Sequence, residues 1–201
     1  RPRPSMPPRP WSPAADKLGA GIGTVNVPIP GQQDSSSSVM QLNEGVEWAL
    51  HVCLALAWRG PDGPVRNATL AETFDLPPVY LNKQLQALAR AGIVRSTPGP
   101  KGGFELARKP DRITVMDVVD AVEGKDDVFA CQEIRQAGIG ARFPRAEFRD
   151  KCVIASVMRD AETEWRRALS DTTIAGIQAT VDGKAAHAEG RMRRWFADGE
   201  I

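Results

Sequence analysis

The segment NATLAETFDLPPVYLNKQLQALARAGIV, residues 67–94, limits the fold more than any other part of the chain. The two adjacent prolines after FDL separate two short stretches with helical spacing, because proline disrupts a helix that precedes it. The second stretch places Leu81, Leu85 and Leu88 on one face and ends at Gly92. Two short helices across a tight turn predict a helix-turn-helix.

A β-hairpin is predicted directly after the second helix. Strand-like runs at Ile93–Ser96 and Phe104–Arg108 flank TPGPKGG, whose proline and glycine residues favour a turn. A hairpin in this position is a candidate wing, so the unit is predicted to be a winged helix-turn-helix. Asn67 or Thr69 is expected to cap the first short helix, because a side-chain oxygen there can accept a bond from a free backbone N–H.

Helices are expected on both sides of this unit. Before it, five apolar residues recur at the spacing of one helix face until GPDGP ends the helix: Val46, Leu50, Cys53, Leu54 and Ala57. After it, residues 113–124 predict another helix, in which Thr114 and Asp117 have the pattern of a capping box. The winged unit therefore has helical neighbours to pack against.

A long helix is expected from about residue 153. Over CVIASVMRDAETEWRRALS the apolar residues alternate in steps of four and three, which is typical of a helix that pairs with a second helix. These residues are Ile154, Met158, Ala161, Trp165 and Ala168. We therefore expect a dimerisation helix, followed by a shorter helix that begins at Ser170 or Asp171.

The predicted fold class is mainly α with a small β-hairpin: a winged helix-turn-helix domain plus a long dimerisation helix. Eight of the 16 prolines fall in the first 40 residues, so this Pro/Ser-rich region is expected to be a disordered tail. The other expected parts are the DNA-binding domain (41–124), a loop without sustained periodicity (125–152), the dimerisation helix region (153–181) and a C-terminal tail (182–201).

Charge and cysteine content limit the partners. The 26 basic and 25 acidic residues nearly cancel, so binding to nucleic acid must depend on local clusters of Lys and Arg. Three scattered cysteines do not make a disulfide framework, which favours a reducing, cytoplasmic location. The most apolar run, residues 48–58, is far shorter than the roughly 20 residues of a membrane-spanning helix, so no membrane association is expected.

From residue 42 to about residue 177 the chain resembles the bacterial winged-helix regulators that include IscR, NsrR and RsrR. Three segments carry the resemblance: VEWALHVCLALA, LPPVYLNKQLQALARAGIVRSTPGPKGGFELAR and ITVMDVVDAVEG. The EWALH of the first segment is most similar to the RsrR type. The resemblance implies a redox-sensing homodimer that binds operator DNA and, as in many members, a [2Fe-2S] cluster held by the loop before the long helix.

The better-known members of this family hold the cluster with three loop cysteines and one residue from elsewhere. This chain differs from them, because its loop offers only Cys131, with Cys152 at its end. Two thiolates cannot fill four positions, so either the cluster is absent or other residues complete it. Glu47 and His51 lie four residues apart, hence on one helix face, and imidazole is a known substitute for thiolate. We expect Glu47 and His51 to serve one iron and the cysteines the other. The resemblance implies that the two pairs come from opposite subunits.

Simpler interpretations of these residues exist. A Glu and a His at helical spacing are more often an exposed ion pair than a ligand pair. The apolar character of the surrounding helix predicts that Glu47 and His51 are buried, which favours ligation instead. Cys53 lies on the apolar face and is expected to be a small buried hydrophobe rather than a ligand. Trp48, beside Glu47, is either a redox-coupled side chain or an ordinary core residue.

DNA contacts are expected from the second short helix and the hairpin, because their polar side chains are of types that reach phosphates or base edges. In the helix these are Tyr80, Asn82, Lys83, Gln84 and Gln86, and in the hairpin region Arg95, Lys101 and Arg108. The expected partner is double-stranded operator DNA.

Two other functions compete with the cluster-bearing regulator. One is a regulator of the same fold that has no cluster and responds to a small molecule or to oxidation of Cys131. The other is a metal-dependent or thiol enzyme that uses His51, Glu47 and a cysteine. An enzyme is disfavoured, because the sequence has no nucleophile motif, phosphate loop or zinc spacing such as CxxC or HExxH.

Overall fold

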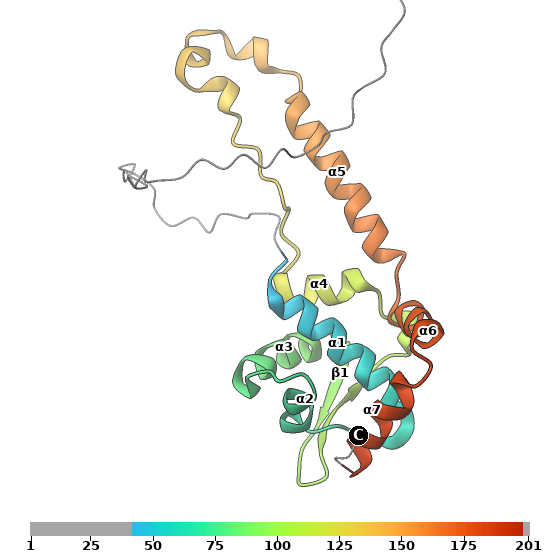
Figure 1. Cartoon of the computed structure of the whole chain (residues 1–201). Coiled ribbons are helices and arrows are strands. Elements are labelled where there is room, and N and C mark those ends of the chain that lie inside the picture. The colour runs from blue at the N-terminus through green and yellow to red at the C-terminus, as the bar shows by residue number, and fades with distance from the viewer. Residues whose placement is uncertain (1–41, 199–201) are drawn as a thin grey trace, which may run out of the picture. The chain divides into compact units, whose positions relative to one another are not determined.

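The computed structural model describes residues 42–198 (Figure 1), and the predicted disordered tail lies outside these residues. The described part is mainly helical and includes a two-stranded antiparallel sheet, which confirms the predicted fold class. Its helices and strands are α1 (Glu44–Arg59), α2 (Asn67–Thr73), α3 (Pro78–Arg90), β1 (Val94–Thr97), β2 (Gly103–Leu106), α4 (Val115–Glu123), α5 (Val153–Ser170), α6 (Ile174–Lys184) and α7 (Ala188–Asp198). None of the helices within residues 42–198 has the length and apolar character needed to cross a bilayer.

Helix α1 lies at the centre of the packing. The side chain of Asn43 caps its start by accepting a hydrogen bond from the N–H of Gly45 at 2.7 Å, and Gly60 ends it with a positive φ of 54°. Helices α3, α4, α6 and α7 all pack against it (Figure 1). Of the apolar face predicted for this helix, Val46, Cys53 and Leu54 are buried, and Leu50 and Ala57 are partly buried. Cys53 is fully buried, as expected.

The helix-turn-helix consists of α2 and α3. The predicted face of α3 is confirmed, because Leu81, Leu85 and Leu88 are all fully buried. The predicted cap of α2 is wrong: the residue in the cap position is Arg66, and α2 already begins at Asn67. The side chain of Asn67 instead donates a hydrogen bond to the carbonyl of Pro78 at 3.1 Å, which ties the start of α2 to the start of α3.

The wing is the hairpin of β1 and β2, in which Val94 pairs with Leu106 and Thr97 with Gly103. Val65 adds a third, short edge by exchanging backbone hydrogen bonds of 2.8 and 2.9 Å with Phe104. This approach requires glycine at position 103, because a Cβ there would lie 2.3 Å from the Val65 carbonyl oxygen. The segment before α2 and the wing are thus held together.

Buried polar contacts attach α5 to the rest of the fold. Glu162 is only 6% exposed, and it accepts hydrogen bonds from the N–H of Val128 at 3.2 Å and from Arg166 at 3.0 Å. Arg166 also pairs with Asp120 of α4 at 3.3 Å. Burial raises the pKa of Glu162, but the Val128 N–H and Arg166 outweigh it, so the pKa lies below the ordinary carboxyl value.

The structure differs from the sequence predictions after residue 124. The loop 125–152 contains the short 3-10 helices Ile134–Gln136, Gly138–Arg142 and Arg145–Phe148. Helix α6 starts later than expected, because Thr173 caps it by accepting a hydrogen bond from the N–H of Gly176 at 3.0 Å. The region expected to be a C-terminal tail contains α7, whose Phe196 packs against the main core. The capping box of Thr114 and Asp117 is present as predicted.

Candidate functional site

The exposed face of α3 carries most of the predicted DNA-contacting side chains of this helix. Tyr80 is 64% exposed, and Asn82, Lys83 and Gln86 are exposed as well. Gln84 differs from them, because it is only half-exposed and lies against α1: a Cβ on Gly45 would lie 2.6 Å from its Nε2. The side chain of Gln84 therefore lies between α3, the second helix of the helix-turn-helix, and the start of α1.

The three predicted cations of the wing differ in whether their side chains already have partners within the chain. Lys101 is exposed at the hairpin turn, whereas Arg95 pairs across the strands with Glu105 at 2.9 Å. Arg108 donates to the carbonyl of Gly92 at 3.2 Å and reaches Asp117 at 3.4 Å, so it has a structural role within one chain. Of the three predicted cations, Lys101 is the one whose side chain has no hydrogen bond or ion pair within residues 42–198.

Arg66 is a cation that the sequence analysis missed. Its guanidinium donates to the carbonyl of Pro100 at 2.9 Å, so it joins the start of the helix-turn-helix to the tip of the wing. It is exposed and adjoins the first residue of α2. A cation directly before the first short helix was the available signal, but only the folded hairpin shows what Arg66 contacts.

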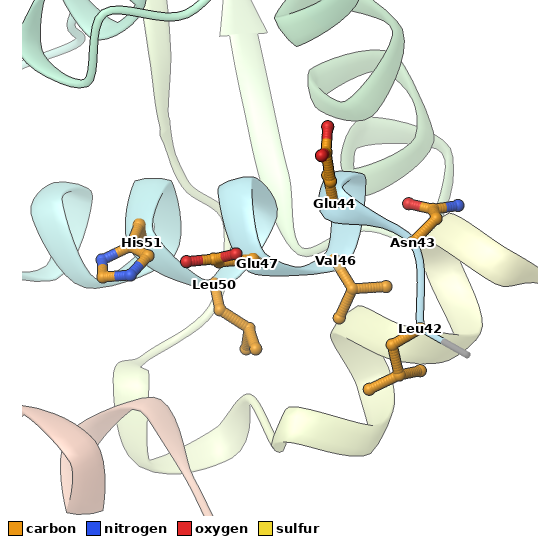
Figure 2. A pocket seen from close by; sticks show the side chains of 7 residues that line it. All are labelled: Leu42, Asn43, Glu44, Val46, Glu47, Leu50 and His51. Atoms are coloured by element: carbon orange, nitrogen blue, oxygen red, sulfur yellow. The ribbon is translucent and has the colours of Figure 1, made fainter. Parts of the chain in front are cut away.

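Glu47 and His51 are exposed on α1, so the prediction that both are buried is wrong. They lie at the edge of the apolar face rather than within it. Together with Leu42, Val46 and Leu50 they line a pocket of about 340 Å³. Figure 2 shows that Glu47 extends along the helix toward His51, while Glu44, which also lines the pocket, points away from Val46 and Leu50. The two side chains form one open, adjacent pair of oxygen and nitrogen donors.

The two loop cysteines form a second pair. Cys131 is exposed and accepts a hydrogen bond from the N–H of Glu133 at 3.4 Å, and Cys152 occupies the cap position at the start of α5. Arg135 pairs with Glu133 at 3.0 Å and donates to the carbonyl of Asp150 at 2.9 Å. It therefore links the segment of Cys131 to that of Cys152, although the two cysteines are 21 positions apart.

The environment of Cys152 favours its thiolate. The backbone N–H of Ala155 lowers the pKa of Cys152 most, and the N–H of Ile154 and the charge of Arg135 lower it further. The pKa therefore lies below the ordinary thiol value. Burial has the opposite effect on Cys53, whose pKa rises to about 12, so Cys53 is an inert thiol as expected.

A single chain does not bring the two pairs together. Across residues 42–198 the structure contains no group of three or more His, Cys, Asp or Glu side chains arranged to hold a metal ion. Each pair supplies two donors of types that iron accepts, whereas a [2Fe-2S] cluster needs four. The donor chemistry fits half of such a site on α1 and the other half on the loop, and one chain does not join the two halves.

A helix-turn-helix, a wing and an exposed polar face on the second helix define a winged-helix DNA-binding protein. The chain belongs to the Rrf2 family, described as iron-dependent transcriptional regulators, whose sequence profile matches residues 42–180. Proteins of this family are transcription regulators rather than enzymes. The resemblance based on the three sequence segments is thereby confirmed.

Individual relatives agree with this assignment. YffB of Lactococcus lactis is 33% identical over 138 residues, which cover 69% of this chain and 86% of YffB. The HTH-type transcriptional regulator IscR of Aliivibrio salmonicida is 35% identical over 92 residues, covering 46% of this chain and 55% of that protein. Among solved structures, IscR of T. potens has a TM-score of 0.55 at 22% identity, covering 72% of this chain and 90% of that one.

A second solved structure supports the same fold. CymR, the global cysteine regulator of B. subtilis, has a TM-score of 0.54 at 22% identity, covering 71% of this chain and 98% of that one. At these identities the two structures establish the fold alone. The signal that this chain senses therefore depends on the chemistry of its own residues.

Proposed function

We propose that the protein is a homodimeric, redox-sensing transcription regulator whose operator affinity depends on a [2Fe-2S] cluster. Glu47 and His51 of one protomer would hold one iron, and Cys131 and Cys152 of its partner the other. The observation that carries the proposal is the presence of two separate, accessible donor pairs, each incomplete within one chain. The iron dependence in the description of the family adds support.

The first half of α5 offers a surface for the second copy. Val153, Ile154 and Val157 are 75%, 68% and 59% exposed, a concentration of apolar side chains that water disfavours. They directly follow Cys152 in the sequence, so a partner that covers them is brought to the cysteine pair. Pairing along α5 would bury these side chains and place one protomer's α1 within reach of the other's loop.

The protein groups around the sites prepare the ligands. The N-terminal N–H groups of α5 and the charge of Arg135 favour the thiolate of Cys152, which is the form that binds metal. Cys131 and Cys152 would supply thiolates to one iron, and Glu47 and His51 would supply a carboxylate and an imidazole to the other. The cluster, when bound, supplies one-electron redox chemistry.

Helix α1 connects the donor pair to the DNA-binding surface. Gly45, two residues before Glu47, lies against the side chain of Gln84 in α3. Movement or a charge change at the start of α1 would therefore be transmitted to the recognition helix. Trp48, next to Glu47 and half-exposed, is a second residue that can respond to charge at this site. To act as a switch, the two redox states must bind the operator with different affinities.

The test is an assay of iron and sulfide with visible absorption and EPR spectra after anaerobic purification. The proposal predicts a coloured protein with about two iron and two sulfide per chain. Cys131→Ala, Cys152→Ala and His51→Ala should each lose or reshape the spectrum, while the matched control Cys53→Ala leaves it unchanged. A colourless, iron-free wild-type protein would overturn the proposal.

A second candidate function is a thiol switch without a cluster. It is favoured by Arg135, which bonds to Glu133 near Cys131 and to Asp150 near Cys152, and by the lowered pKa of Cys152. In that case the protein would be iron-free, and mild oxidation would link the two cysteines and change DNA binding. Mass spectrometry of the oxidised protein together with the iron assay separates the two functions.

A further inference from the structure

A second pocket lies between four helices, and no residue of the loop that carries Cys131 and Cys152 lines it. It has a volume of about 460 Å³, within the range of small-molecule sites. Its lining is contributed by α1, α2, α6 and α7 and is mainly apolar. Its aromatic side chains are Trp58, Phe74 and Trp195, next to His51, and its charged side chains are Glu72 and Arg191.

The aromatic walls of this pocket are fixed in place. The indole N–H of Trp58 donates to Asp182 at 3.0 Å, and that of Trp195 donates to the hydroxyl of Thr73 at 2.8 Å. The rings of His51 and Phe74 lie 5.7 Å apart. Because the indole N–H groups already have partners, the rings offer only their apolar surfaces to a ligand. Such walls suit a flat aromatic molecule.

Arg191 gives the pocket a cation for an anionic ligand group. Arg193, on the same helix, pairs with Asp62 at 2.6 Å and Glu189 at 3.5 Å, whereas Arg191 has no ion-pair partner among residues 42–198. Glu72 also lines the pocket, and it disfavours a ligand with several negative charges. The arrangement therefore fits a ligand with one anionic group next to its rings.

The pocket depends on a part of the chain that the family profile does not include. That profile ends at residue 180, and α7 spans Ala188–Asp198. Arg191, Met192 and Trp195 of α7 line the pocket together with residues of α1 and α2. This site is thus an addition to the elements that define the family.

We propose that this pocket binds a small, flat aromatic molecule that carries a single anionic group. His51 lines both this pocket and the one beside Glu47, and Phe74 follows the first helix of the helix-turn-helix. A bound ligand would therefore contact both α1 and the helix-turn-helix. Binding itself needs no cluster, so this proposal stands or falls independently of the proposed cluster ligation.

The test uses two fluorescent dyes with the same ring systems, anilinonaphthalene sulfonate and the neutral phenylnaphthylamine, titrated into the full chain. We expect about one dye of either kind to bind per chain. Arg191→Gln should weaken the sulfonate by about tenfold and the neutral dye by less than about twofold. Trp195→Ala should weaken both by about tenfold. Circular dichroism confirms that each variant is folded.

Two variants serve as controls. Arg194→Gln removes a neighbouring exposed cation of α7 that does not line the pocket and should leave both affinities unchanged. Ile139→Ser removes a 74% exposed apolar side chain elsewhere on the loop and should also have no effect. Unchanged sulfonate affinity in Arg191→Gln, or loss of dye binding in Ile139→Ser, would overturn the proposal.

Discussion

The apolar faces of α3 and α5 differ in how far a single chain covers them. In α3, Leu81, Leu85 and Leu88 are fully buried against the neighbouring helices. In the first half of α5, Val153 and Ile154 are 75% and 68% exposed. The second half of α5 does find partners within the chain, because Trp165 packs against core residues of α1 and α4, but its first half does not. Within residues 42–198 the winged unit is therefore fully packed, whereas the apolar start of α5 is left uncovered.

This difference separates the two tasks of the molecule. The winged unit presents the predicted DNA-contacting side chains from a packed core, so its geometry is fixed by folding alone. The proposed sensing part would depend on assembly, because each predicted donor pair supplies only half of the ligands that a [2Fe-2S] cluster needs. Changes in the core should therefore reduce the stability of the chain, and changes on α5 should reduce association.

The largest effect on stability is expected from truncating the core of α3. Leu85→Ala should lower the free energy of unfolding by about 3 kcal/mol, because it leaves a cavity in a fully buried site. Val79→Ala is the matched control on the same helix: Val79 is 82% exposed, and its loss should change stability by less than about 0.5 kcal/mol. Denaturant unfolding measures both, and equal effects would contradict the contrast.

A charge on the exposed face of α5 should separate the protomers. Val157→Glu is expected to weaken dimerisation by about a hundredfold, since a buried, unpaired carboxylate costs several kcal/mol. The folded state of each chain should be retained. Arg159→Gln, two residues further and hence on another side of the helix, should leave the dimer intact. Analytical ultracentrifugation reports the outcome, and a stable Val157→Glu dimer would place the interface elsewhere.

Removing the buried charge of α5 should have an intermediate effect. Glu162→Gln should cost about 2 kcal/mol, because it leaves Arg166 and the Val128 N–H less well paired. The exposed pair of Glu164 and Arg167 provides the control, and Glu164→Gln should cost less than about 0.5 kcal/mol.

The same substitution has a defined pH dependence. Since the folded-state pKa of Glu162 is lowered, its contribution is present above the unfolded pKa and is lost as pH falls through the folded pKa. The stability difference between wild type and Glu162→Gln should therefore shrink on acidification. A difference that is constant through the acidic range would contradict the assigned ion pair.

The smallest effect concerns the reactivity of Cys152. Its lowered pKa means that the reactive thiolate forms at lower pH than in an ordinary thiol. Alkylation by iodoacetamide, followed by mass spectrometry of the iron-free protein, should have its pH midpoint below the ordinary thiol value. Arg135→Ala should move that midpoint upward, while Arg142→Ala, a neighbouring loop cation, should not. An unmoved midpoint in Arg135→Ala would remove Arg135 from this role.

The winged unit could be predicted from the sequence because its signals are local. The leucine spacing of α3, the capping box at Thr114 and the glycine-rich turn of the wing each determine structure over a few residues. The error there has a tertiary cause: Asn67 bonds to Pro78 rather than capping α2, a contact that depends on how the two helices meet.

The candidate site was less accessible to sequence reasoning. Helical spacing correctly placed Glu47 and His51 side by side. The apolar character of the helix wrongly predicted that both are buried, because both lie exposed at the edge of the apolar face. The link that Arg135 makes between the segments of Cys131 and Cys152 arises from 3-10 turns that have no periodic signature. Helix α7 was missed because its arginines mask the pattern of Met192, Trp195 and Phe196.

The most direct test of the central claim is a mixed dimer. One copy carries Glu47→Gln with His51→Ala, the other carries Cys131→Ala with Cys152→Ala, and different affinity tags isolate the pair. If the ligands come from opposite protomers, each variant alone holds no iron, whereas the mixed dimer keeps one complete site and about half of the wild-type iron and sulfide. A mixed dimer without iron, beside an iron-loaded wild type, would contradict ligation across the two protomers.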